Sequence, residues 1–217
     1  MTGRRRPVLP LAVAAVLIGS LALGGWLLGR ARPAGAQAVG YVLPKPPVIW
    51  MPSPNFVQRP PGERIDTIII HDTESPGVKM AQTIARYFDD PASGVAAHYV
   101  IGKDGEIVQC VHDAAEANQA GISMFRGRDH VNAFSIGIEL VNSQSGHDPF
   151  TAAQYRSLGR LVAYLVTRYD IPLDRIVGHH DVSMHPQIKR DPASNFSWQR
   201  FFDQVEADLA SAPLASR

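Results

Sequence analysis

Residues 65–71 read IDTIIIH, and this short stretch decides what kind of fold the chain can adopt. Its three consecutive isoleucines are β-branched and apolar, which is typical of a strand that is buried on both faces. Such strands belong to sheets that helices cover, and a buried strand has no packing use for a histidine at its end. The stretch therefore predicts an α/β fold and makes His71 a residue to explain.

The rest of the chain alternates between strand-like and helix-like patterns. Helices are predicted for residues 78–90, 151–170 and 197–209, and further strands for residues 97–102, 106–111, 134–140 and 174–180. The second helix starts with a capping-box pattern at Thr151 and Gln154, and Asp104-Gly105 forms the turn of a hairpin. This order predicts a single α/β domain with a central mixed β-sheet flanked by helices.

The first 38 residues have the composition of an export signal. An arginine cluster precedes an apolar run over residues 8–29, and small residues follow it. As a helix this run would be roughly 33 Å long, which is enough to cross a bilayer. We therefore expect an exported protein, periplasmic or extracellular. Residues 1–38 are either a cleaved signal peptide or a membrane anchor, and membrane contact is expected only through residues 8–29.

Residues 39–62 are rich in proline, which excludes a helix or a central strand. We expect an extended arm on the surface of a domain that spans residues 63–212. The chain has 21 basic and 20 acidic residues, and five of the basic ones lie in the first 38 residues. The remainder is mildly acidic, which argues against nucleic acid as the main partner. Cys110 is the only cysteine and is expected to be a buried, inert thiol.

Three predicted strands end in polar residues, where α/β folds place their chemistry. The strand ends carry His71, Glu139 and the adjacent pair His179 and His180. Two imidazoles and one carboxylate suit zinc with an open fourth position, and His71, one histidine of the pair and Asp191 supply that set. Since neighbouring strand residues face opposite sides, only one of the pair can face the metal. The residues alone predict a zinc hydrolase and leave the class of bond open.

Seven segments occur in an order and at a spacing typical of one known family. They are SPNFVQRP (53–60), IIIHDT (68–73), AAHYVIGKDGEIVQCV (96–111), FRGRD (125–129), SIGIELVN (135–142), VGHHDV (177–182) and KRDP (189–192). Through them residues 53–202 resemble the zinc-dependent N-acetylmuramoyl-L-alanine amidases. That family includes an amidase-type phage lysozyme and the animal peptidoglycan recognition proteins.

The resemblance implies a role for each candidate residue. The implied zinc ligands are His71, His179 and Asp191, which settles the choice between the two adjacent histidines. Glu139 would take the proton of the attacking water, and Lys189 would stabilise the tetrahedral oxyanion. The implied reaction cleaves the amide between N-acetylmuramic acid and L-alanine of the stem peptide. The expected partner is a peptidoglycan muropeptide substrate, and we expect a monomer.

One departure from the family keeps other interpretations open. Many members carry Trp-His where this chain has Asn118-Gln119, and an amide cannot act as acid, base or cation. A non-catalytic peptidoglycan-binding recognition domain is therefore the alternative, although such relatives typically lose the third ligand, which is present here as Asp191. A zinc peptidase that cuts within the stem peptide would use the same ligands. Arg126 and Arg128 are candidates for holding a stem-peptide carboxylate.

Overall fold

The computed structural model describes residues 41–185 and 188–211. The segment 1–38, for which a signal peptide or membrane anchor is predicted, lies outside these residues. Within the described part of the chain, no helix combines the length and apolar character that a membrane span requires.

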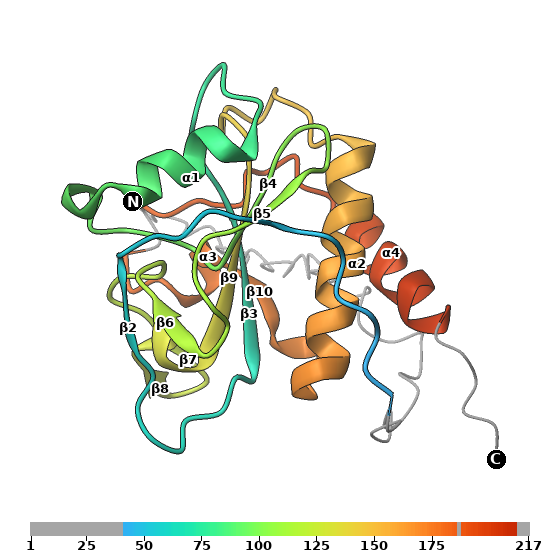
Figure 1. Cartoon of the computed structure of the whole chain (residues 1–217). Coiled ribbons are helices and arrows are strands. Elements are labelled where there is room, and N and C mark those ends of the chain that lie inside the picture. Colours follow the sequence, from blue (N-terminus) through green and yellow to red (C-terminus); the bar gives the residue numbers. More distant parts are fainter. Residues whose placement is uncertain (1–40, 186–187, 212–217) are drawn as a thin grey trace, which may run out of the picture. The chain divides into compact units, whose positions relative to one another are not determined.

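A six-stranded mixed sheet in the order β1-β5-β4-β9-β3-β10 forms the centre of the described residues (Figure 1). Its strands are β1 (Ile49–Trp50), β3 (Thr67–Asp72), β4 (Tyr99–Ile101), β5 (Ile107–Gln109), β9 (Ser135–Leu140) and β10 (Ile176–Gly178). Neighbouring strands run parallel except in the β4–β5 hairpin, which is antiparallel as predicted. The α/β fold with a central mixed sheet is confirmed.

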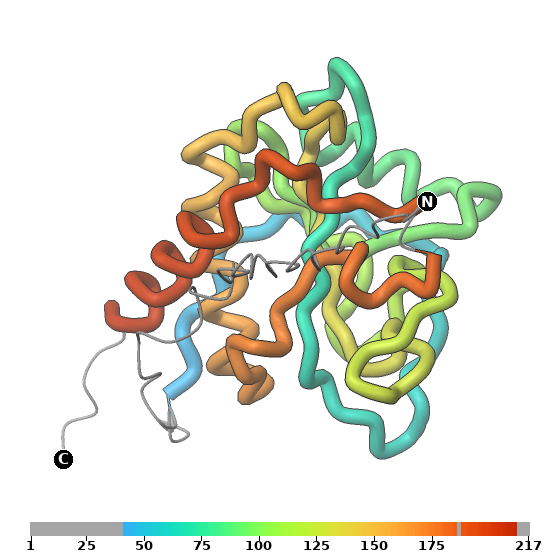
Figure 2. The backbone as a smooth tube through the Cα atoms, turned by 180° about the vertical axis from the view of Figure 1, so that it is seen from behind, coloured from blue at the N-terminus to red at the C-terminus, as the bar shows by residue number. Residues whose placement is uncertain are grey.

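Smaller elements surround this sheet. They are the strand pairs β2 (Phe56–Gln58) with β6 (Ala115–Ala117) and β7 (Met124–Phe125) with β8 (Arg128–Asp129), and the 3-10 helices η1 (Pro91–Ser93), η2 (Val131–Phe134) and η3 (Leu173–Arg175). The helices are α1 (Ala81–Asp89), α2 (Ala152–Tyr169), α3 (His179–Val182) and α4 (Trp198–Ala210). Figure 2 shows α4 running beside α2, while α1 covers the hairpin strands from another side.

The predicted start of α2 is confirmed in detail. The hydroxyl of Thr151 accepts the backbone N–H of Gln154, and the amide oxygen of Gln154 accepts the N–H of Thr151. This reciprocal pair satisfies two donors that an open helix end would leave without partners. It fixes where α2 begins and therefore which of its residues face the sheet.

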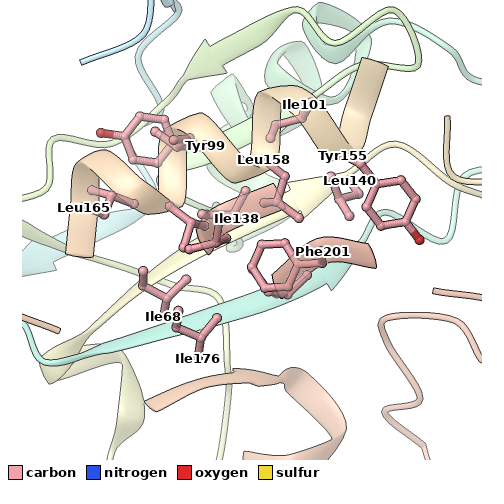
Figure 3. Close-up of a cluster of buried hydrophobic side chains, with 14 of the residues drawn as sticks. Ile68, Tyr99, Ile101, Ile138, Leu140, Tyr155, Leu158, Leu165, Ile176 and Phe201 are labelled. Atoms are coloured by element: carbon pink, nitrogen blue, oxygen red, sulfur yellow. The ribbon is translucent and has the colours of Figure 1, made fainter. Parts of the chain in front are cut away.

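The main core lies between the sheet and the helices α2 and α4. Figure 3 shows Ile68 and Ile138 of the sheet gathered with Leu158 and Leu165 of α2 and Phe201 of α4. Because side chains alternate along a strand, the odd-numbered residues of β3 and β9 face the other side. That side receives the polar ends of both strands, so it is where the site forms.

The proline-rich segment enters the domain more deeply than a surface arm. Its strand β1 extends the sheet at its edge, in parallel with β5. The buried guanidinium of Arg59 donates hydrogen bonds to four backbone carbonyl oxygens, those of Asp113, Asn132, Ala133 and Ser135, over 2.7–3.1 Å. These acceptors lie far along the chain, so local composition gives no sign of them.

Candidate metal centre

Three side chains from distant parts of the chain meet beside the sheet. His71 stands near the end of β3, His179 is the first residue of α3, and Asp191 lies in the loop before α4. The Nδ1 atoms of His71 and His179 lie 2.8 and 3.0 Å from Oδ2 of Asp191. The two rings meet edge to face with centroids 4.6 Å apart. All three side chains are buried, so the structure brings together the three residues predicted as ligands.

The position of the histidine pair differs from the predicted strand end. Strand β10 stops at Gly178, and His179 and His180 open the short helix α3. Adjacent helix residues point about 100° apart, so only His179 reaches the cluster. His180 turns away, with Nδ1 3.2 Å from the backbone oxygen of Asp191 and Nε2 3.0 Å from the carboxylate of Asp181. The carboxylate of Asp181 also accepts the N–H of Gly178, which holds the start of α3.

The residues of the cluster fit a divalent metal ion. One ligand atom from each of His71, His179 and Asp191 can be chosen so that all lie within 4.8 Å of one another. Two imidazole nitrogens and a carboxylate, with one position left for water, are the usual donors of a catalytic zinc site. Oδ1 of Asp191 is buried without a hydrogen-bond partner among the described residues, as expected of an oxygen placed for a cation.

The pKa values follow from burial and from the shared carboxylate. Burial raises the pKa of Asp191, but hydrogen bonds from His179 and His71 outweigh it and hold that pKa well below its usual range. Burial lowers the pKa of His71, but the hydrogen bond to Asp191 and the charge of Glu139 raise it to about 9. For His179 burial dominates and the pKa is lowered. The cluster therefore holds Asp191 as an anion, which is the form that binds a cation.

Glu139 lies directly across from His71 in the parallel pairing of β3 and β9. Its side chain is half-buried, and Oε2 has no hydrogen-bond partner among the described residues. Burial raises the pKa of this carboxyl group to about 8, although the nearby His71 opposes the shift. A carboxyl group with a pKa near neutrality is suited to accepting and returning a proton.

A cleft of about 440 Å³ opens over these groups. Its lining includes the polar side chains of the cluster, Glu139 and Lys189. It also includes apolar side chains of α1 and the following loop, namely Ile84, Tyr87, Phe88 and Val95. The charge of Lys189 also contributes to lowering the pKa of His179. The structure thus places both predicted catalytic side chains at the same opening as the cluster.

The two arginines predicted as candidates for a substrate carboxylate lie elsewhere. Arg126 forms an ion pair with Asp174, and Arg128 forms ion pairs with Glu63 and Asp66. Neither belongs to the residues that line the cleft. Their guanidinium groups are used to join loops of the domain.

Sequence reasoning missed a carboxylate next to the first histidine. Asp72 points to the opposite side of β3 from His71, where its Oδ2 accepts the N–H of Ala193 over 2.6 Å. This bond ties the loop that carries Asp191 to the strand that carries His71. Burial raises the pKa of Asp72 to about 6. Strand alternation alone would have assigned this residue to the core side, without indicating a partner 121 residues away.

The remaining histidine on a strand-like segment has a structural place. His98 is fully buried, and its Nδ1 accepts the N–H of Gly137 over 3.0 Å. Its Nε2 lies 3.1 Å from the carbonyl oxygen of Ala115. His98 therefore has a structural, hydrogen-bonding role. Cys110 is buried as predicted.

Residues 61–194 match the protein family described as N-acetylmuramoyl-L-alanine amidase. The chain belongs to this family. The match covers more than half of the chain and confirms the family and the enzyme class that the sequence predicts.

The relatives of this amidase agree with that assignment. It is 37% identical over 172 residues to the 1,6-anhydro-N-acetylmuramyl-L-alanine amidase AmpD of Haemophilus influenzae, which covers 71% of this chain and 90% of the relative. A selenomethionine derivative of AmpD has a similar structure, with a TM-score of 0.66 and 34% identity over 73% of this chain and 94% of that one. AmiD from E. coli in complex with the substrate anhydro-N-acetylmuramic acid-L-Ala-D-gamma-Glu-L-Lys gives a TM-score of 0.56 and 28% identity over 69% and 65%.

Proposed function

We propose that this chain is a zinc-dependent peptidoglycan hydrolase that cleaves the amide bond between N-acetylmuramic acid and the L-alanine of the stem peptide. The observation that carries the proposal is the buried cluster of His71, His179 and Asp191, set beside Glu139 in a domain of the amidase family. Zinc bound there would supply a Lewis acid for the amide carbonyl and a water molecule with a pKa lowered to about 7. His71, His179 and Asp191 are its proposed ligands.

Glu139 is the proposed general base and general acid. It takes a proton from the attacking water and returns it to the leaving amine of L-alanine. Two observations support this role: the carboxyl group faces the same opening as the cluster, and its pKa is raised to about 8 by burial. A carboxylate of ordinary pKa would be a weaker base towards the attacking water.

Lys189 is the proposed stabiliser of the oxyanion. The tetrahedral intermediate of amide hydrolysis carries a negative charge on the former carbonyl oxygen, and a fixed cation next to it lowers the barrier. Lys189 lines the cleft and stands two residues before Asp191, so the loop that delivers the third ligand also places the ammonium group.

The proposed substrate is a peptidoglycan muropeptide. The cleft volume of about 440 Å³ lies in the range of small-molecule sites, and its mixed polar and apolar lining suits a substrate that joins a sugar to a peptide. The named substrates of the relatives support the same class. On the basis of residues 1–38 we also propose that the enzyme acts outside the cytoplasmic membrane. A monomer is proposed as its working form.

The test is digestion of purified sacculi and of a defined muropeptide by the full-length protein, with a chelator and with zinc added back. The expected products are peptides with a free L-alanine amine and muramoyl ends without a stem peptide, formed only with metal. Products cut within the stem would show a zinc peptidase instead. Binding to sacculi without any product, in protein that contains zinc, would show a recognition domain and refute the amidase.

The location has its own test. N-terminal sequencing of the protein from membrane and exported fractions distinguishes an intact anchor from a new N-terminus after the small residues that follow residue 29. An intact N-terminus in the cytosolic fraction would refute export without affecting the proposed chemistry.

A further inference from the structure

We propose that Gln119 is a positioning residue that holds the ring of His71 in the orientation and tautomer needed for metal binding. This inference rests on the proposed zinc function. It gives a role to a residue for which the sequence offers none, because an amide is neither an acid, a base nor a cation.

The first observation is a contact with Nε2 of His71, the ring nitrogen that faces away from Asp191. Oε1 of Gln119 lies 2.8 Å from Nε2 of His71, while Nδ1 on the other side of the ring faces Asp191. An amide oxygen can only accept a hydrogen bond, so it requires the hydrogen of the ring on Nε2. Here Nδ1 donates its own hydrogen to Asp191. When a metal takes the place of that hydrogen, the lone pair is on Nδ1, the nitrogen that points into the cluster. Metal-binding histidines commonly donate their other N–H to such an acceptor.

The second observation is that the amide itself is fixed. Nε2 of Gln119 donates to the hydroxyl oxygen of Ser135 over 2.8 Å, and Ser135 is fully buried. With a hydrogen on Nε2 of His71, the reversed amide would place its NH₂ group against the N–H of the ring, so the ring requires the orientation seen here. The bond to Ser135 holds the amide in place with its oxygen toward the histidine.

The third observation is the space that the amide occupies. Ser135, Gly137 and Glu139 share one face of β9, and the side chain of Gln119 lies over the middle residue. A Cβ atom on Gly137 would come within 1.8 Å of Oε1 and 2.4 Å of the amide carbon of Gln119. Gly137 does not have a positive φ, so the backbone conformation does not require a glycine here. The glycine matters because its missing side chain leaves room for the amide of Gln119.

The loop serves the second histidine in the same way. The carbonyl oxygen of Ala120 lies 3.4 Å from Nε2 of His179, and the N–H of Ala120 is held by the side chain of Asn132. Residues 119 and 120 therefore offer one acceptor to the outer nitrogen of each histidine. This loop therefore supports both histidines of the metal centre from the side away from Asp191. Of its two acceptors, only that of Gln119 belongs to a side chain and can be changed by substitution.

The experiment measures zinc affinity of the full-length protein by competition with a chromophoric chelator. Gln119→Met keeps the length of the side chain but removes the acceptor, and should weaken zinc binding about 10- to 100-fold. Gln119→Glu keeps an acceptor and should retain the affinity. Asn118→Ala, a change at the neighbouring position, should leave zinc affinity unchanged. The visible absorption of the cobalt(II)-loaded protein should change in Gln119→Met and not in the other two.

Gly137→Ala provides an independent route to the same effect. The added methyl group crowds the amide away from His71, so the variant should lose zinc affinity as Gln119→Met does. The double variant Gln119→Met/Gly137→Ala should lose no more than either single variant, because both remove one contact. If Gln119→Met does not fold, Gly137→Ala with undiminished affinity overturns the inference.

The outcomes separate this inference from the proposed function. Wild-type protein that binds no zinc would refute the proposed function itself. Wild-type protein that binds zinc, together with a folded Gln119→Met variant of equal affinity and unchanged cobalt spectrum, would overturn the role of Gln119 alone.

Discussion

Replacing Arg59 by methionine tests how far the proline-rich segment is part of the fold. The change removes the donor of four hydrogen bonds to backbone carbonyl oxygens, in a side chain that is 9% exposed. At the low end, about 1 kcal/mol for each carbonyl left without a partner, the loss is about 4 kcal/mol. Burial also lowers the pKa of Arg59, which means that burying its charge is unfavourable, and the variant is relieved of that cost. The net loss of unfolding free energy is therefore about 3 kcal/mol.

The assay is urea and thermal unfolding followed by circular dichroism, with Arg64→Met as the control. Arg64 is exposed, so the same chemical change there should alter stability by less than about 0.5 kcal/mol. For a domain of this size the Arg59 variant should melt roughly 6–12 °C lower. An Arg59→Met protein as stable as Arg64→Met would refute the reasoning, because it would show that the four carbonyl oxygens find other partners at no cost.

Four further predictions concern the site and its support. Glu139→Gln should keep zinc by elemental analysis while kcat on a defined muropeptide falls on the order of 10²- to 10⁴-fold, and full activity would remove Glu139 from the mechanism. Lys189→Met should reduce kcat on the order of 10²-fold or more with little change in zinc content; an effect confined to KM would assign it to substrate binding instead. Asp191→Ala should lose zinc and activity together, and an active variant without zinc would contradict the proposed ligand set. Burial lowers the pKa of His98 to about 4, so the folded state favours its neutral form. The resulting stability is complete above about pH 6.5 and is lost as the pH falls towards 4, a contribution of about 3 kcal/mol. His98→Asn should show a flatter decline in urea midpoint across that range, and an unchanged decline would exclude His98 as its source.

Much of the fold follows from patterns that are local in the sequence. The isoleucine run before His71 predicts β3 because a strand buried on both faces has a continuous apolar sequence. Thr151 and Gln154 alone predict the start of α2, because they form a capping box. Less local features were misplaced. The helix predicted for residues 78–90 begins only at Ala81. Met80 precedes it and is exposed, while Ala81 and Ala85 occupy the buried side of the helix.

The candidate site divides in the same way. The cluster residues were predictable because each stands at or near the end of a recognisable segment, even though His179 lies on a helix where a strand was expected. The supporting residues could not be found from the sequence. Gln119 and Asp72 act through partners 48 and 121 residues away. Neither the hydrophobic periodicity nor the spacing of motifs in the sequence indicates such contacts.

Strand β9 also limits how this domain can vary over evolution. Every second residue from Ser135 to Glu139 faces the metal centre, and the residues between them face α2 and α4. An inserted or deleted residue within the strand would exchange the two sets, sending a carboxyl group into the hydrocarbon interior and an isoleucine into the cleft. Insertions and deletions in descendants of this chain should therefore accumulate in connecting loops such as residues 143–148, while the length of β9 stays fixed.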